Sequence, residues 1–169
     1  MGDKLLSADR APSSLGFLLS QVGTHAAKRF AEHIAETGLQ PPLFRVLNAV
    51  DAAEGQSQQA IGKAIGAPAS RMVAIVDELQ LGGLVERRPH PGDRRVRALY
   101  LTKKGRGTLA RGRRIAAEHE EDLAAGLSQA DRRRLVALLQ RIVESQQIGR
   151  GVHPGLGEPR ERRSARQNP

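Results

Sequence analysis

Five arginines lie within one short stretch of this sequence, and their clustering indicates chemistry more directly than any other pattern in the chain. They are Arg87, Arg88, Arg94, Arg95 and Arg97. Lysine and arginine bind polyanions because they neutralise phosphates and release condensed counterions. Arginine on a thin projection also fits a narrow DNA minor groove. A solvated basic strand pair is the alternative, but it does not explain why the cluster directly follows a pair of predicted helices.

The overall charge agrees with a polyanionic partner. The 169 residues carry a formal net charge of +9, which favours nucleic acid as first candidate and an anionic membrane surface as second. A membrane binder needs a basic amphipathic helix with exposed bulky apolar residues, which the arginine-rich segment 111–114 lacks. The sequence contains no cysteine, which excludes disulfides, thiol redox sensing and Cys-ligated zinc. The sequence shows no apolar signal region or spanning segment, so we expect a cytoplasmic protein.

No pattern of side chains predicts catalysis. The sequence offers no Ser-His-Asp order and no complete phosphate-binding glycine motif, and Gly105 to Gly107 lacks the rest of a nucleotide fingerprint. His25 and His33 share one helical face, but zinc would also need carboxylates there, and a hydrogen-bonding or surface role is the simpler interpretation. We therefore expect no enzymatic activity, no metal and no cofactor.

Apolar periodicity predicts the helices that would position the arginines. Ser57 is the expected N-cap of a short helix that ends at Gly66, and Pro68 opens the next. A short helix, a tight turn and a second helix together place a recognition helix in the major groove. Small Gly62 is expected where these two helices approach closely. Steps of three and four predict helices over residues 14–38, after Pro41, over 57–65, over 68–81, and two within 103–147.

The apolar period changes to two after the recognition helix. Residues 84–88 and 95–101 alternate as strands do, and the Pro- and Gly-rich segment 89–93 suits a turn. This pattern predicts a β-hairpin with a basic tip. The predicted fold is mainly α with a small β-wing, in which long helices flank a winged helix-turn-helix at residues 57–101.

These motifs resemble the MarR family of bacterial transcription regulators. The family places Asp-x-Arg in the wing and Leu-Thr before the next helix, and Asp93, Arg95, Leu101 and Thr102 match this pattern. The resemblance covers residues 14–147. It rests on the short helix at 57–66, the sequence SRMVAIVDELQLGGLVERR at 70–88, the wing at 92–95 and the exit at 99–105.

The resemblance implies a sequence-specific regulator, usually a repressor, that binds a pseudo-palindromic operator as a homodimer. A MarR-type domain would span residues 14–148, with dimerisation helices at 14–38 and 103–147. The arm at 1–13 is expected to be flexible, and the basic tail at 149–169 disordered. A non-specific nucleoid or architectural protein, binding mainly through the tail, is the alternative from another class.

Individual roles follow from the resemblance and from helical spacing. Asp93 is expected to pair with Arg95 and fix the wing, so that Arg94 points into the minor groove. On the recognition helix, Arg71 and Ser70 are the polar candidates for base contacts. The predicted DNA-binding residues are Gln58, Lys63, Pro68, Ala69, Ser70, Arg71, Val73, Ala74, Arg87, Arg88, Asp93, Arg94, Arg95 and Arg97.

The recognition helix departs from the usual family sequence at two positions. Many family members carry Thr or Ser in place of Val73 and Arg in place of Ala74, so individual base contacts here differ from the usual pattern. Asp77 and Glu78 are acidic on a DNA-proximal helix and are expected to pair with basic neighbours such as Arg97 or Arg71.

The resemblance also implies a small-molecule effector pocket, although core packing explains its apolar members equally well. Its candidate lining residues are Phe17, Gln21, His25, Phe44 and Leu47.

Overall fold

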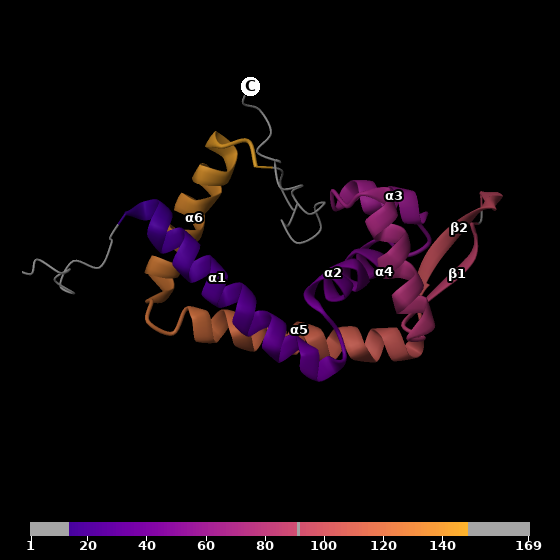
Figure 1. Ribbon diagram of the computed structural model, residues 1–169, viewed down its shortest axis with the longest axis horizontal. Helices are drawn as coiled ribbons and strands as arrows, with labels where there is room; N and C mark the ends of the chain where they lie inside the picture. Colours follow the sequence, from indigo (N-terminus) through magenta and orange to yellow (C-terminus); the bar gives the residue numbers. More distant parts are fainter. Residues whose placement is uncertain (1–13, 91, 149–169) are drawn as a thin grey trace, which may run out of the picture.

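The computed structural model describes residues 14–90 and 92–148, and within the wing it leaves out the side chains of Asp93 and Arg94. The predicted arm at 1–13 and tail at 149–169 lie outside the described residues. The fold is mainly helical with one antiparallel strand pair, as predicted. The elements in chain order are α1 (Leu15–Ile34), the 3₁₀ turn η1 (Ala35–Thr37), α2 (Pro41–Ala52), α3 (Gln58–Ala64), α4 (Ala69–Leu81), β1 (Val85–His90), β2 (Asp93–Leu101), α5 (Lys103–Leu123) and α6 (Gln129–Ser145) (Figure 1).

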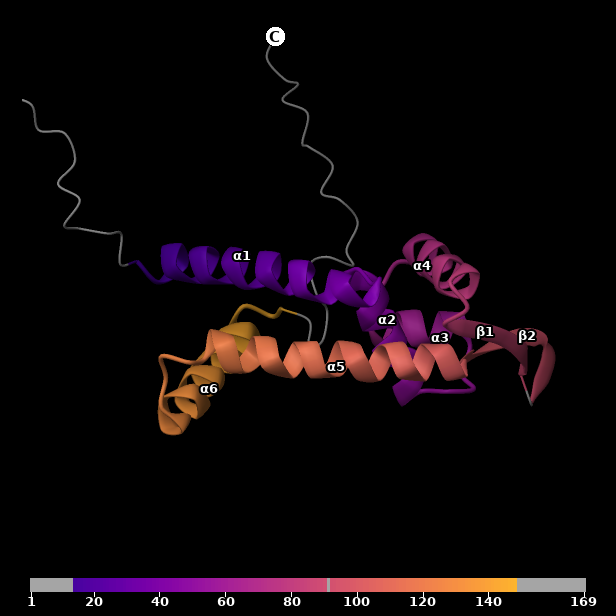
Figure 2. The ribbon, with the colours of Figure 1, turned by 90° about the horizontal axis from the view of Figure 1, so that it is seen from below.

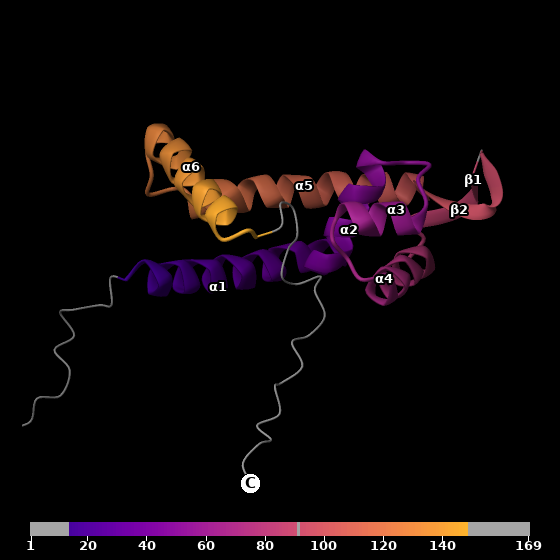
Figure 3. The same ribbon diagram turned by 90° about the horizontal axis from the view of Figure 1, so that it is seen from above.

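The molecule is elongated along two helices. Helices α1 and α5 run side by side, with α2, α3, α4 and the strand pair at one end and α6 at the other (Figure 2, Figure 3). The strand pair projects beyond α4 as a wing. In the part of the chain that the structure describes, no helix is both long and apolar enough to cross a membrane.

Side-chain caps explain where most of the helices begin. The hydroxyl oxygens of Ser14, Ser57, Thr102 and Ser128 each accept a hydrogen bond from the backbone N–H three residues further on. Such a cap satisfies one of the N–H groups that a helix N-terminus leaves without a partner. The cap at Ser57 confirms the sequence expectation. α1 ends at Ile34, slightly earlier than predicted, because η1 tightens the chain before Gly38.

The core lies at the winged end. Most of its buried side chains come from α2, α3, α4 and β2, which pack around one another. Ile34 at the end of α1, Leu39 and Leu109 of α5 complete it. Burial of an aliphatic side chain contributes about 2 kcal/mol, so this core holds the two helices of the helix-turn-helix against the base of the wing. The largest fully buried side chains are Ile34, Leu39, Leu47, Ile61, Met72, Leu79, Leu99 and Leu109.

Two glycines permit close approaches within this core. A Cβ on Gly62 would lie 2.8 Å from Cγ of Met72, so α3 and α4 cross closely there, as the sequence predicts. A Cβ on Gly105 would lie 1.9 Å from the carbonyl oxygen of Leu84. Beside it, the Thr102 hydroxyl donates to the carbonyl oxygen of Gly83 at 2.6 Å. The start of α5 is therefore fixed directly against the base of the wing.

The opposite end of the molecule has no comparable core. None of the residues of α6, all of which the structure describes, is buried, and of α1 only Ile34 is. An intramolecular core therefore accounts for the end of α1 but not for its first three turns. The large apolar side chains left exposed in this region are Leu15, Phe17, Leu18, Leu19, Val22, Leu123, Leu127, Leu135, Val136, Leu138 and Ile148.

Candidate nucleic-acid interface

Helix α4 has a buried face and an exposed face. Met72, Ile75, Val76 and Leu79 point into the core. Pro68 is the half-buried N-cap residue. The exposed face carries all the predicted groove-facing residues of the helix itself, namely Ala69, Ser70, Arg71, Val73 and Ala74. The helix can therefore offer one basic, one hydroxyl and several small apolar groups to a partner.

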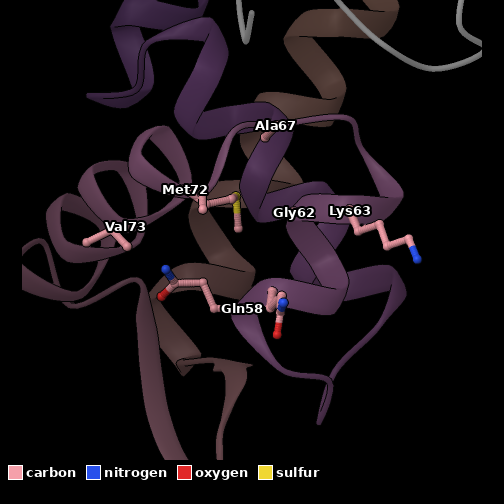
Figure 4. Close-up of a pocket in the computed structure, with 8 residues that line it drawn as sticks. Gln58, Gly62, Lys63, Ala67, Met72 and Val73 are labelled. Carbon is pink, nitrogen blue, oxygen red and sulfur yellow. The ribbon is translucent and has the colours of Figure 1, made fainter. Parts of the chain in front are cut away.

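A surface hollow of about 540 Å³ is lined by residues of both α3 and α4 (Figure 4). Met72 reaches toward Gly62 across the helix pair, whereas the Lys63 ammonium extends outward from α3. The structure thus brings together four predicted DNA-binding residues from two consecutive helices. They are Gln58 and Lys63 of α3 with Ala69 and Val73 of α4.

The segment before α3 is joined to the wing by backbone hydrogen bonds. The Gly55 N–H donates to the Leu99 carbonyl at 3.0 Å, and the Leu99 N–H donates to the Gln56 carbonyl at 3.0 Å. Ser57 forms a further bridge with Ala98 of β2. The N-terminus of α3 therefore has a fixed position relative to the wing.

The strand register separates the wing arginines onto two faces. Successive side chains of a strand point to opposite sides, and Val85 is buried on the inner side. Arg87, two residues on, shares this inner face with its cross-strand partner Leu99. Arg88 lies on the outer face, 2.5 Å from the Glu86 carboxylate and with its guanidinium 4.8 Å from the Tyr100 ring centre. The hydrogen bond and charge of the Glu86 carboxylate raise the pKa of Arg88 from its ordinary value.

The side chain of Arg87 is bound by both helices of the helix-turn-helix. One terminal nitrogen donates to the Gln58 side-chain oxygen at 3.1 Å and to the Asp77 carboxylate at 2.5 Å. The other terminal nitrogen donates to the side-chain oxygen of Gln80. The prediction that Asp77 pairs with a basic neighbour is confirmed, but the partner is Arg87 and not Arg97 or Arg71, because strand alternation directs Arg87 toward α4. Only about a quarter of the Arg87 side chain, 24%, is exposed.

The outer part of the wing is only partly described. Arg95 and Arg97 of β2 are exposed, and Arg97 pairs in register with Pro89 before the strand pairing shifts at His90. The side chains of Asp93 and Arg94 lie outside the described residues. The pairing of Asp93 with Arg95 and the outward direction of Arg94 stay predictions.

Sequence reasoning missed several charged groups that brace the interface. Glu54 accepts from the Leu101 backbone N–H at 2.8 Å and pairs with Arg106 at 2.9 Å. Arg113 of α5 pairs with Asp51 of α2 at 2.7 Å. The two residues are 62 positions apart in the sequence, so no local sequence pattern predicts this ion pair. These pairs link α2, α5 and the exit from the wing.

Arg45 of α2 is a further brace that the sequence did not reveal. It donates from a terminal nitrogen to the Ile65 carbonyl oxygen at 3.5 Å, at the end of α3. Its Nε is buried and finds no hydrogen-bond partner among the described residues. Burial lowers the pKa of Arg45 from its ordinary value.

A second hollow, of about 350 Å³, lies between α1 and α5. Its walls are mostly small side chains, with Phe30 and His119 as the larger groups. The His119 ring is buried, 5.6 Å from the Phe30 ring, and its Nδ1 has no hydrogen-bond partner in the described ranges. The lining residues are Gly23, Ala26, Ala27, Phe30, Ala116, His119 and Glu120.

The five predicted effector-pocket residues fall into two separate groups. Leu47 is fully buried in the core, and Phe44 is half-buried with its ring 5.9 Å from that of Phe30. Phe17, Gln21 and His25 are exposed on the first part of α1. Over residues 14–90 and 92–148, no three His, Asp or Glu side chains gather in a group that could hold a metal ion.

The fold and the site together define a winged helix-turn-helix protein of the kind that binds DNA. A family model described as the MarR family matches residues 37–96. A protein of Thauera aromatica, whose name assigns it the regulation of the hcr operon, is 35% identical over 129 residues, covering 76% of this chain and 78% of its own. The chain belongs to the MarR family of transcriptional regulators, which are not enzymes.

Two solved structures extend this comparison. The transcriptional repressor CouR, bound to a 23-mer DNA duplex, has 34% identity and a TM-score of 0.71, and the match covers 82% of this chain and 98% of CouR. CouR of Rhodococcus jostii RHA1 bound to p-coumaroyl-CoA has 30% identity and a TM-score of 0.65, with 77% and 92% coverage. The similarity therefore includes both the winged end and the long helices.

Proposed function

We propose that this regulator is a homodimeric repressor that binds a pseudo-palindromic DNA operator through α4 and the wing. The main support for a dimer is the exposed apolar surface that α1, α5 and α6 present in the single chain. A 17-residue helix without a buried residue has little tertiary packing to stabilise it. A second copy of the same surface, related by a two-fold axis, would bury both.

The two ends of the molecule then have separate roles. The apolar ends of two chains meet, and the two winged ends lie on either side of the two-fold axis. Two recognition helices in one dimer read half-sites about one helical turn apart, on a pseudo-palindrome. The DNA-bound structure of CouR, at 34% identity, supports the same use of the winged end here.

We assign the DNA contacts by chemistry and exposure. Arg71 is the one charged side chain in the segment 69–74, so it is our candidate for a guanine edge or a phosphate. Val73, which is 47% exposed, suits a thymine methyl group. Lys63 would bind phosphate beside the major groove, and Arg94 would enter the minor groove.

A small-molecule effector would release the operator by favouring one dimer geometry over the other. The ligand-bound structure of CouR supports an effector for this chain as well. A ligand changes DNA affinity only by the difference in its own affinity for the two geometries. Binding of an effector without any change in operator affinity would contradict this part of the proposal.

Protection footprinting on a bound duplex tests the proposal. We expect a protected site with two-fold symmetry, and we expect Arg71→Ala to weaken binding and relax the base preference at one position per half-site. Arg114→Ala is the matched control. Arg114 is an exposed arginine on α5, outside the proposed DNA contacts, and it forms a long ion pair of 3.7 Å with the exposed Glu118. Unprotected DNA, or equal loss in both variants, would refute the assigned interface.

A further inference from the structure

We propose that Arg87 is a positioning residue that sets the wing relative to the recognition helix, and that it does not bind DNA phosphate. The inference rests on the proposed DNA-binding function and deepens it. Its basis is the Arg87 clamp, which we define as Arg87 of β1 with Gln58 of α3 and Asp77 and Gln80 of α4. One side chain thus joins the wing to both helices of the helix-turn-helix.

The geometry of the clamp suits arginine in particular. A guanidinium group presents several N–H donors in a rigid planar fork. Here its two terminal nitrogens satisfy three acceptors that come from two different helices. A lysine ammonium is a point charge on a flexible stem and does not reproduce this arrangement. The clamp therefore fixes both the distance and the direction between β1 and α4.

The position of the side chain separates Arg87 from the other wing arginines. Its terminal nitrogens are occupied by protein acceptors, and the side chain is three-quarters covered. Arg88 is next in sequence but lies on the outer face, with 56% of its side chain exposed. Strand alternation thus gives adjacent arginines different surroundings. Their different exposure provides a direct comparison within one strand.

The clamp matters for DNA reading because α4 and the wing must contact one duplex together. The recognition helix enters the major groove while the wing tip reaches an adjacent groove. A wing that pivots at its base loses this simultaneous fit, so the cost falls on specific binding. Counterion release depends on the number of phosphates contacted, and loosening the clamp does not remove a phosphate-binding side chain.

Asp77→Asn is the decisive variant. It keeps the shape of the side chain but removes the charge that binds Arg87 in the clamp. If Arg87 positions the wing, this variant should bind a duplex selected by the wild type at least about tenfold more weakly, because hydrogen bonds to charged groups are strong. If Arg87 instead binds phosphate, losing an acidic neighbour should leave affinity equal or raise it. The two interpretations therefore predict opposite signs.

Glu86→Gln is the matched control, because it removes the carboxylate that pairs with Arg88 on the outer face of the same strand. We expect its operator affinity to be unchanged or higher. Arg87→Lys keeps the positive charge and should weaken specific binding by a similar factor to Asp77→Asn. If Arg87 instead bound phosphate, the lysine would still neutralise that phosphate, so affinity for both duplexes should stay close to wild type.

The measurement is fluorescence anisotropy with full-length dimers, using the selected duplex and a random duplex at several salt concentrations. Circular dichroism and sedimentation confirm that each variant keeps its helix content and its dimer. The inference is overturned if Asp77→Asn binds the selected duplex as tightly as wild type, or if random-duplex affinity falls equally. A wild-type protein that does not discriminate the two duplexes overturns the proposed function as well, so the two failures are distinguishable.

Discussion

Replacing Leu135 and Leu138 of α6 by serine is expected to separate the proposed dimer. Each of these side chains is 44% exposed in the single chain. Full burial of a leucine contributes about 1.5–3 kcal/mol, so covering the exposed part contributes about 1 kcal/mol for each residue. The double variant should therefore lose about 2 kcal/mol per chain and, by two-fold symmetry, about 4 kcal/mol per dimer. This loss raises the dimer Kd about a thousandfold.

Sedimentation equilibrium over a series of protein concentrations measures this constant. The matched control is Leu81→Ser, since Leu81 is 92% exposed at the end of α4, away from the apolar surface of α6. The control should dimerise like wild type. Circular dichroism should show a fully folded winged end in both variants, because the core there involves neither α6 residue. A wild-type protein that is monomeric at every concentration, or an unchanged Kd in the double variant, would refute the reasoning.

Three further predictions concern stability and DNA affinity. Gly105→Ala should destabilise the protein by about 3 kcal/mol in urea unfolding, because its Cβ would lie 1.9 Å from the Leu84 carbonyl oxygen. Gly107→Ala is its control, with no described atom within 4 Å of the added Cβ, and should stabilise α5 by up to about 1 kcal/mol; equal effects would contradict this packing account. Arg94→Ala should weaken operator binding, most on duplexes with a narrow minor groove where the wing contacts them, and an unchanged operator affinity would exclude the minor-groove contact. Deleting residues 149–169 should change operator affinity only modestly, and abolished binding would favour the non-specific architectural alternative.

The helix boundaries followed from the sequence because their causes are local. A serine or threonine at the N-cap accepts a hydrogen bond from the backbone N–H three residues further on, so the cap depends on neighbouring residues alone. Ser57 and Thr102 are examples. The close crossing of α3 and α4 at Gly62 was also predictable. Gly62 is small and lies in a short helix, and Gly66 forms the tight turn that follows that helix. These features depend on spacing within about one helix.

The partners of the wing arginines are set by tertiary contacts, which spacing along the chain does not show. Treating Arg87 and Arg88 as one basic cluster overlooked a signal that was present, namely that buried Val85 places Arg87 on the same inner face. The sequence did not show which carboxylate lies opposite that face, so the partner of Asp77 was predicted wrongly. Arg113 and Asp51 pair across a large sequence separation, and no spacing rule relates them.

The proposed effector residues illustrate a different limit. The family resemblance placed Phe17 and Leu47 in one pocket, but it did not say which apolar side chains a single chain buries. In the structure Leu47 is fully buried and Phe17 is 42% exposed. The difference arises because α2 lies within the core of the winged end, whereas the first turns of α1 extend beyond it (Figure 1).

Selection of bound sequences from a pool of random DNA duplexes tests the central claim most directly. The account predicts enrichment of one inverted repeat, with half-site centres about 10–10.5 base pairs apart, or a multiple of this spacing. Affinity for the enriched duplex should be on the order of tens of nanomolar or tighter. A pool that shows no enrichment, with equal affinity for every duplex, would contradict a dimeric, sequence-specific repressor.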